Sequence, residues 1–301
     1  MHSSRGRAFK DARAKRGSEG TGCIAEGDDD RQGCNGELIP EAKRRASVAN
    51  LCSLKGITGV KLLRLAMWSG PRNISTAMMR AWENRADTVV VDEPLYAFYL
   101  GATGKNHPMA EEVIAAGEID WRKVVASLTI KAIAGKTIFY QKQMTHHLLP
   151  EVGREWIGSL TNCFLIRDPA EVITSYVKKK DDPTLEDLGF VQQAEIFDLV
   201  RRQTGTVPPV IEAGDVLRNP ERALRLLCAA IGIEFDRAML SWPPGLRPTD
   251  GAWAKHWYGE VAQSTGFAPY REQRIEVPAH LRELEKHCRS CYERLYEHRL
   301  I

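Results

Sequence analysis

The chain has 301 residues, of which 43% are hydrophobic and 27% charged, so it can bury a sizeable core. Its net charge of +3 lies within residues 1–60, where Lys and Arg exceed Asp and Glu, and the remainder is neutral. A neutral body excludes the basic footprint of a protein that coats nucleic acid, and no stretch reaches the ~20 apolar residues of a membrane span.

The N-terminal stretch differs in composition from the rest. Residues 1–58 are rich in Gly, Ser, Asp, Arg and Lys and lack hydrophobic periodicity, which predicts a disordered extension. No apolar run follows the basic start, so a secretory signal is not predicted, and an organellar import signal in Ser3–Arg16 is the alternative. Seven cysteines without framework spacing indicate free thiols in a reducing compartment, so we expect a cytoplasmic protein.

From residue 59 onward, apolar runs alternate with helical patterns, which indicates a single domain over residues 59–301. We expect strands at residues 61–68, 88–91, 136–140, 162–166 and 208–212. We expect helices at residues 75–84, 121–134, 170–178, 220–231 and 278–298. Such alternation predicts a three-layer α/β fold, in which a mostly parallel central sheet is flanked by helices. Ligands bind such sheets beyond the strands' carboxyl ends, so loops 69–76, 92–96, 141–147 and 167–169 should share one rim.

The loop after the first expected strand combines the groups of an anion site. It reads Ser69-Gly70-Pro71-Arg72-Asn73-Ile74-Ser75-Thr76 and supplies a cation, hydroxyls and backbone N–H groups at a helix start. It lacks the Gly-Lys-Ser/Thr of a Walker A loop, so ATP hydrolysis is not favoured. Taken alone, the loop also fits an ordinary capped helix.

A second candidate anion site follows the fourth expected strand. Arg167 ends that strand, and Ser175 lies eight residues later, two turns along the following helix. A guanidinium and a hydroxyl in these places can converge on one phosphate. The alternative is a salt bridge from Arg167 to Asp168 or another carboxylate, with Ser175 exposed.

Together these segments resemble the sulfotransferase family. Residues 69–76 look like its 5′-phosphosulfate loop, and residues 164–176 are similar to its 3′-phosphate motif, Arg-Asp-Pro followed by Ser-Tyr at the same spacing. Residues 210–220 and 247–257 resemble two later motifs of the family. The four matches occur in the family's order over residues 61–270, so the resemblance implies a P-loop-like nucleotide fold.

The resemblance implies a donor, an acceptor and a set of contacts. The donor would be 3′-phosphoadenosine 5′-phosphosulfate, and the acceptor a hydroxyl or amine of a small molecule or carbohydrate. No metal is needed for such a transfer, and the sequence shows no metal-ligand cluster. The donor-binding residues would be Gly70, Pro71, Arg72, Asn73, Ile74, Ser75, Thr76, Arg167 and Ser175, helped by Arg247 or Lys255.

An acceptor hydroxyl needs a general base, and two residues compete for that role. Glu93 follows an expected strand at the active rim, where family members that act on sugars or tyrosine carry a catalytic Glu. His146 is the alternative, because cytosolic members carry Lys-Thr-His after the third strand, although Gln143 aligns with that histidine. Lys142 would stabilise charge alongside Arg72.

The sequence also departs from the family pattern. Ile74 stands where the phosphosulfate loop normally has Gly, and Ala213-Gly214 replaces a usual Tyr-Glu. Pro248 follows Arg247 where the family has Lys. Two readings compete with an active sulfotransferase: a P-loop kinase-like nucleotide enzyme, and a catalytically inactive nucleotide-binding protein.

Overall fold

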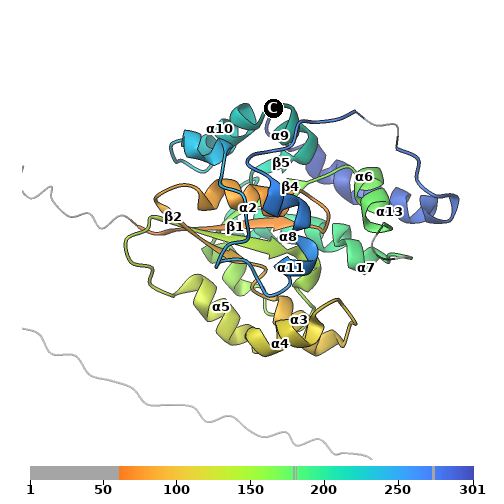
Figure 1. Cartoon of the computed structure of the whole chain (residues 1–301), viewed down its shortest axis with the longest axis horizontal. Helices are drawn as coiled ribbons and strands as arrows, with labels where there is room; N and C mark the ends of the chain where they lie inside the picture. Colours follow the sequence, from red (N-terminus) through yellow and green to blue (C-terminus); the bar gives the residue numbers. More distant parts are fainter. Residues whose placement is uncertain (1–60, 179, 181, 273–274) are drawn as a thin grey trace, which may run out of the picture. The chain divides into compact units, whose positions relative to one another are not determined.

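A computed structural model describes residues 61–178, 180, 182–272 and 275–301, and its centre is a five-stranded parallel sheet (Figure 1). The strand order is β2-β3-β1-β4-β5, and every neighbouring pair is parallel. The strands are β1 (Leu63–Ser69), β2 (Thr88–Asp92), β3 (Ile138–Met144), β4 (Thr161–Ile166) and β5 (Val210–Glu212). The predicted α/β fold with a parallel sheet is therefore confirmed, while the disordered extension predicted for residues 1–58 lies outside the described residues.

The sheet is buried on both faces, because apolar side chains alternate between two cores. In β1, Leu65 and Met67 contribute to one core, while Ala66 and Trp68 contribute to the other, and all four are fully buried. Burial on both faces is the reason that this strand is a continuous apolar run instead of an alternating pattern.

Helices cover each face, which gives the three predicted layers (Figure 1). One face is covered by α2 (Ser75–Glu83), α9 (Ala213–Arg218), α10 (Pro220–Ala230) and η3 (Arg237–Leu240). The other face is covered by α5 (Trp121–Thr129), η2 (Glu155–Ser159), α6 (Pro169–Tyr176), α8 (Phe190–Thr204), η4 (Ala279–Leu281) and α13 (Arg282–Tyr296).

A third apolar cluster lies beside the β2 end of the rim. It joins α3 (Tyr96–Thr103) and α4 (Ala110–Ala116) to a late segment that holds α11 (Ala254–Trp257) and α12 (Gly259–Gln263). Within it, Trp253 and Tyr258 pack among the rings and aliphatic groups of α3. The late part of the chain therefore reaches the end of β2, although Tyr258 and Asp92 lie 166 positions apart in the sequence.

Several boundaries differ from the sequence prediction. The expected loop 141–147 was wrong in its first part, because β3 continues to Met144 and η1 (Thr145–His147) follows. Gln141, Lys142 and Gln143 are thus buried strand residues, since β3 has neighbouring strands on both sides to pair its backbone groups. The helix expected at 121–134 ends at Thr129, and α13 begins at Arg282 after a short turn.

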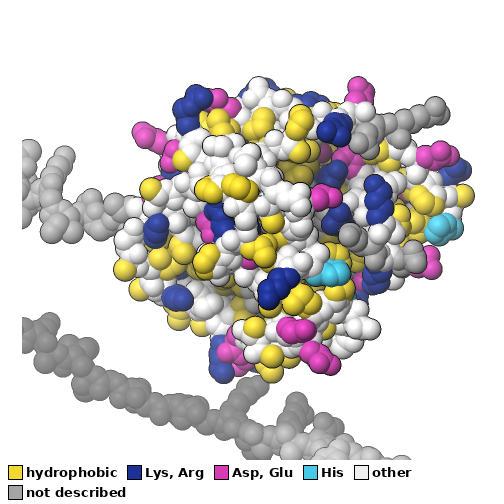
Figure 2. Space-filling view, in the orientation of Figure 1, with side chains coloured by type: hydrophobic (Ala, Val, Ile, Leu, Met, Phe, Trp, Pro, Cys, Tyr) yellow, Lys and Arg dark blue, Asp and Glu magenta, His cyan; other side chains and the backbone are white. Residues whose placement is uncertain are grey.

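No helix among the described residues is long and apolar enough to cross a membrane. On the face shown in Figure 2, acidic, basic and apolar side chains are interspersed, and Lys and Arg side chains gather over the region of α6 and α7 (Leu185–Leu188). The mixture of signs agrees with the neutral composition of this part of the chain.

Gly189 joins α7 to α8 and should be intolerant of a side chain. Its φ is +71°, and a Cβ there would lie 2.5 Å from Oγ1 of Thr145, whose hydroxyl donates to the Gly189 carbonyl. Gly205 is a matched control, because its φ is +69° but no atom of the described residues lies within 4 Å of its Cβ position. We expect Gly205→Ala to lower the free energy of unfolding by about 1–2 kcal/mol and Gly189→Ala by at least about 1 kcal/mol more, measured by urea denaturation. Equal losses of unfolding free energy in the two variants would contradict the close approach of Thr145 to Gly189.

Candidate active site

The turn between β1 and α2 has the backbone of a tight anion-binding loop. Gly70 approaches α7 so closely that a Cβ would lie 2.7 Å from the Leu188 carbonyl oxygen. Arg72 and Ile74 both have left-handed backbone, with φ of 58° and 33°. Ile74 is the N-cap of α2 and makes no side-chain capping bond. A β-branched residue in this conformation is strained by about 1–3 kcal/mol. Ile74, which replaces the family's Gly, therefore stands where the turn requires the left-handed backbone that glycine adopts without strain.

The turn is bound to the β4–α6 connection by side chains that the sequence singled out. Nε of Arg72 donates to Oγ of Ser175 at 2.9 Å, and Nη1 of Arg167 donates to the Arg72 carbonyl at 2.7 Å. Nδ2 of Asn73 donates to the Leu165 carbonyl in β4 at 2.7 Å. The structure therefore brings Arg72, Arg167 and Ser175 together at the carboxyl ends of β1 and β4.

Arg167 also makes an internal ion pair. Its Nε donates to Oε2 of Glu171 at 2.7 Å, one turn along α6, and both side chains are about one-fifth exposed. The salt bridge considered in the sequence thus exists, with Glu171 as the partner, since Asp168 instead binds Arg289. An anion that binds Arg167 must share or displace the Glu171 carboxylate.

A buried ion cluster lies at the ends of β2 and β3. Lys142 and Asp92 are paired in the register of these strands, which puts Nζ 2.9 Å from Oδ1 of Asp92. The same ammonium lies 2.6 Å from Oε1 of Glu93 and 2.7 Å from the hydroxyl of Tyr258. That hydroxyl donates to Oδ2 of Asp92 at 2.6 Å and accepts from the Trp253 indole at 3.2 Å. All three N–H bonds of the ammonium are therefore satisfied.

Burial and the charges within the cluster shift the pKa values of Lys142 and Glu93. Burial lowers the pKa of Lys142, but Asp92, Glu93 and Tyr258 more than offset this, so its pKa is well above the usual value. Burial raises the pKa of Glu93, and the adjacent ammonium offsets that effect only in part. Glu93 remains slightly exposed, while Lys142 and Asp92 are not. The site thus holds a fixed cation beside a carboxyl group of enhanced basicity.

Two histidines lie behind Glu93 in an aromatic stack. His147 stacks on Tyr96 at 4.6 Å and on Tyr99 at 4.7 Å between ring centroids, and its Nδ1 is 3.9 Å from Oε2 of Glu93. His146 meets the Tyr99 ring edge-on. Burial lowers the pKa of His146 to about 3 and that of His147 well below the usual value, so both rings are neutral. The imidazole that approaches Glu93 is therefore that of His147, and not that of His146, the predicted alternative base.

The structure does not gather every predicted residue. Arg247 pairs with Glu83 at 2.6 Å at the carboxyl end of α2, about 12 Å along that helix from the β1–α2 turn. Lys255 is exposed on α11. Gln143 is buried in β3, where its Nε2 donates to Gln141.

Tyr258 and Asp92 are functional candidates that the sequence did not reveal. Asp92 opens the expected rim loop 92–96 but was not singled out, and no sequence spacing links it to Tyr258. The one available signal was the position of Asp92 next to Glu93 at a strand end, which is a common site for catalytic groups in parallel sheets.

Comparison with known proteins assigns most of this chain to one family. A family model described as a sulfotransferase domain matches residues 63–281. The chain is 38% identical over 221 residues to branched-chain-amino-acid aminotransferase-like protein 1 of Arabidopsis thaliana, covering 73% of this chain and 39% of that protein. It is 34% identical over 232 residues to branched-chain-amino-acid aminotransferase-like protein 2 of the same plant, covering 77% of this chain and 41% of that protein. The chain thus spans about two-fifths of the length of these curated relatives.

Solved structures with a similar arrangement are sulfotransferases of low identity. The sulfotransferase from Alicyclobacillus acidocaldarius is 13% identical with a TM-score of 0.47, covering 80% of this chain and 98% of that one. The sulfotransferase domain of the Synechococcus PCC 7002 olefin synthase is 14% identical with a TM-score of 0.43, at the same coverage of both chains.

The buried neutral histidines should make the fold acid-sensitive. Their pKa values are lower in the folded state than the ~6.5 of an unfolded chain, so protonation favours unfolding as the pH falls below that value. We expect each of the two histidines to lower the free energy of unfolding by about 1.4 kcal/mol for every unit by which the pH falls from 6.5 to 5. Denaturation at several pH values should show a shallower slope for His146→Phe or His147→Phe than for the wild type. Equal slopes in the wild type and both variants would contradict this origin.

Proposed function

The chain belongs to the sulfotransferase domain family, and from that premise we propose that it transfers a sulfuryl group from 3′-phosphoadenosine 5′-phosphosulfate to an acceptor hydroxyl or amine. The observation that carries the proposal is the convergence of Arg72, Arg167 and Ser175 at the ends of β1 and β4. A sulfuryl transferase needs two anion sites, one for each end of its donor, and these residues join the two.

The 5′ side of the donor would lie on the β1–α2 turn. Backbone N–H groups at the start of α2, together with the hydroxyls of Ser75 and Thr76, would hold phosphosulfate oxygens. Arg72 would leave Ser175 and offset the charge that grows on the leaving phosphate. The left-handed backbone of Arg72 and Ile74 supports this role, because it turns successive N–H groups toward one point.

The 3′-phosphate would bind Arg167 and Ser175. Glu171 holds the Arg167 guanidinium in its present arrangement, so the phosphate would replace a carboxylate as the partner of that cation. Arg247 and Lys255 are less suited than Arg167 to bind the 3′-phosphate, because Arg247 is paired with Glu83 and Lys255 is exposed.

Glu93 would serve as the general base. Its Oε1 is bound to Lys142, which leaves Oε2 to accept the acceptor's proton. The acceptor oxygen would then bond to sulfur while the bond from sulfur to the phosphate oxygen breaks, releasing adenosine 3′,5′-bisphosphate. Lys142 would hold Glu93 in place and stabilise negative charge near the sulfuryl group. The acceptor would be a small molecule or carbohydrate.

A catalytically inactive nucleotide-binding protein is the second candidate. It is motivated by the strain at Ile74 and by the packing around Gly214, where an added Cβ would lie 2.7 Å from Oε2 of Glu212. The relatives' aminotransferase-like names are not carried over, because the match covers only about two-fifths of the length of those proteins.

Removal of the Arg167 guanidinium should discriminate between nucleotides. We expect Arg167→Ala to weaken binding of adenosine 3′,5′-bisphosphate by about 10- to 100-fold, because charged hydrogen bonds to the 3′-phosphate are lost. Binding of AMP, which lacks that phosphate, should change much less in the same calorimetric titration. The exposed Arg201→Ala serves as a matched control and should alter neither affinity. Equal affinity of the wild type for both nucleotides would rule the donor out.

Removal of the Glu93 carboxylate should abolish transfer and spare donor binding. We expect Glu93→Gln to lower the rate of sulfuryl transfer by about 10²- to 10⁴-fold, the usual contribution of a general base. Transfer from a sulfur-labelled donor into a metabolite extract measures the rate, with exposed Glu112→Gln as the control. Wild-type activity should also fall as acid protonates Glu93, at a pH above the usual range for a carboxyl group. Nucleotide binding without any transfer by the wild type would favour the inactive protein.

A further inference from the structure

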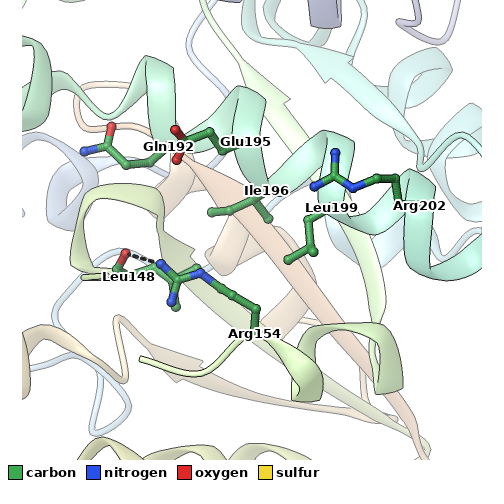
Figure 3. A pocket seen from close by; sticks show the side chains of 7 residues that line it. All are labelled: Leu148, Arg154, Gln192, Glu195, Ile196, Leu199 and Arg202. Atoms are coloured by element: carbon green, nitrogen blue, oxygen red, sulfur yellow. Dashed lines mark hydrogen bonds between the residues drawn. The ribbon is translucent and has the colours of Figure 1, made fainter. Parts of the chain in front are cut away.

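A pocket of about 270 Å³ lies against the outer face of α8, apart from the residues assigned to donor and acceptor (Figure 3). Five side chains of α8 line it at helical spacing, and Leu148 and Arg154 face them from the segment that follows η1. The five are Gln192, Glu195, Ile196, Leu199 and Arg202. Ile196 and Leu148 are also members of the buried core, so the floor of the pocket is held in place by the body of the domain.

Charges of both signs line the pocket, yet they do not pair with one another. Within the described parts of the chain, no ion pair within 4 Å involves Arg154, Glu195 or Arg202. Cations and a carboxylate that share a pocket without neutralising each other suit a ligand that carries both charges itself.

Arg154 is built into the pocket wall and keeps unused donors. Its Nη2 donates to the carbonyls of Leu148 and Leu149 at 3.1 and 3.0 Å, and its Nη1 donates to that of Val152. A guanidinium has five N–H bonds, so three are occupied and two remain for a ligand. Burial lowers the pKa of Arg154 despite the nearby Glu195, as expected of a cation that lacks a close anion.

The remaining surface adds an apolar wall and an adaptable amide. Figure 3 shows Ile196 and Leu199 on the side of α8 that looks toward Arg154, and Leu148 continues this apolar surface. Gln192 contributes a carboxamide whose Oε1 is buried and has no hydrogen-bond partner among the described residues. The volume has room for roughly nine water-sized groups at about 30 Å³ each, which is the size of one small amino acid.

We propose that this pocket binds a small zwitterion, an α-amino acid with a short aliphatic side chain. The carboxylate would accept from one unused N–H bond of Arg154, because the remaining Nε–H and Nη1–H bonds point in different directions, and the ammonium would lie against Glu195. The aliphatic group would lie on Leu148, Ile196 and Leu199. The site is independent of the proposed sulfuryl transfer, because none of its residues takes part in that reaction.

L-Leucine and two analogues that each lack one of its charges test the proposal by isothermal titration calorimetry on the full chain. We expect 4-methylpentanoate and 3-methylbutylamine to bind at least about tenfold more weakly than L-leucine, because each leaves one charged group unpaired. Glu195→Gln should weaken L-leucine by about tenfold and leave 4-methylpentanoate unchanged, since only the ammonium contacts Glu195. Glu195 is exposed and makes no ion pair with the described residues, so this variant should fold.

Glu112→Gln, an exposed carboxylate on α4, is the matched control and should bind L-leucine as the wild type does. Arg154→Gln should weaken both L-leucine and 4-methylpentanoate, with thermal unfolding used to verify that the variant is folded. Absence of L-leucine binding at about 10 mM would overturn the proposal, as would binding that Glu195→Gln does not change. Equal affinity for L-leucine and 4-methylpentanoate would also overturn it, because a carboxylate would then suffice.

Discussion

The buried ammonium of Lys142 is the constraint on which the rest of the rim depends. A charge without water around it is tolerated only when its surroundings supply compensating charge and hydrogen bonds, and breaking such a buried pair costs about 3–5 kcal/mol. Asp92 and Glu93 supply the charge from the end of β2, and Tyr258 supplies the third contact from the late segment. Burial of one lysine thus fixes both the geometry of Glu93 and the attachment of residues 253–258 to the sheet.

The segment α7–Gly189 contacts both the β1–α2 turn and the end of β3. Gly70 of the β1–α2 turn lies against the Leu188 carbonyl, and the next residue, Gly189, accepts from Thr145 at the end of β3. Asp187 of the same helix binds both Lys105 and Lys180, which come from the loops after α3 and α6. A helix of four residues therefore contacts the turn, the third strand's end and two loops.

Local patterns predicted the fold well because each strand contains an apolar run and is followed by polar or Gly-Pro residues. They also predicted that the loops carrying Arg72 and Arg167 share one rim, since strand ends in a parallel sheet lie at one edge, but not the bond from Arg72 to Ser175. They failed at Lys142, because a polar run in a central strand has the composition of a loop. They also could not find Tyr258, whose contact with Asp92 joins residues 166 positions apart and depends on tertiary packing alone.

Backbone strain is concentrated at the same edge. Five non-glycine residues of the described chain have positive φ, and Arg72, Ile74 and Glu93 are three of them. Left-handed backbone in such residues persists only where other contacts hold it. The Arg72 carbonyl is held by Arg167, and the Glu93 amide donates to the Lys142 carbonyl at 3.0 Å while its carboxylate binds the Lys142 ammonium. Each strained turn is therefore fixed by a cation of the neighbouring strand, so the contacts that would position donor and acceptor are the contacts that maintain the strain.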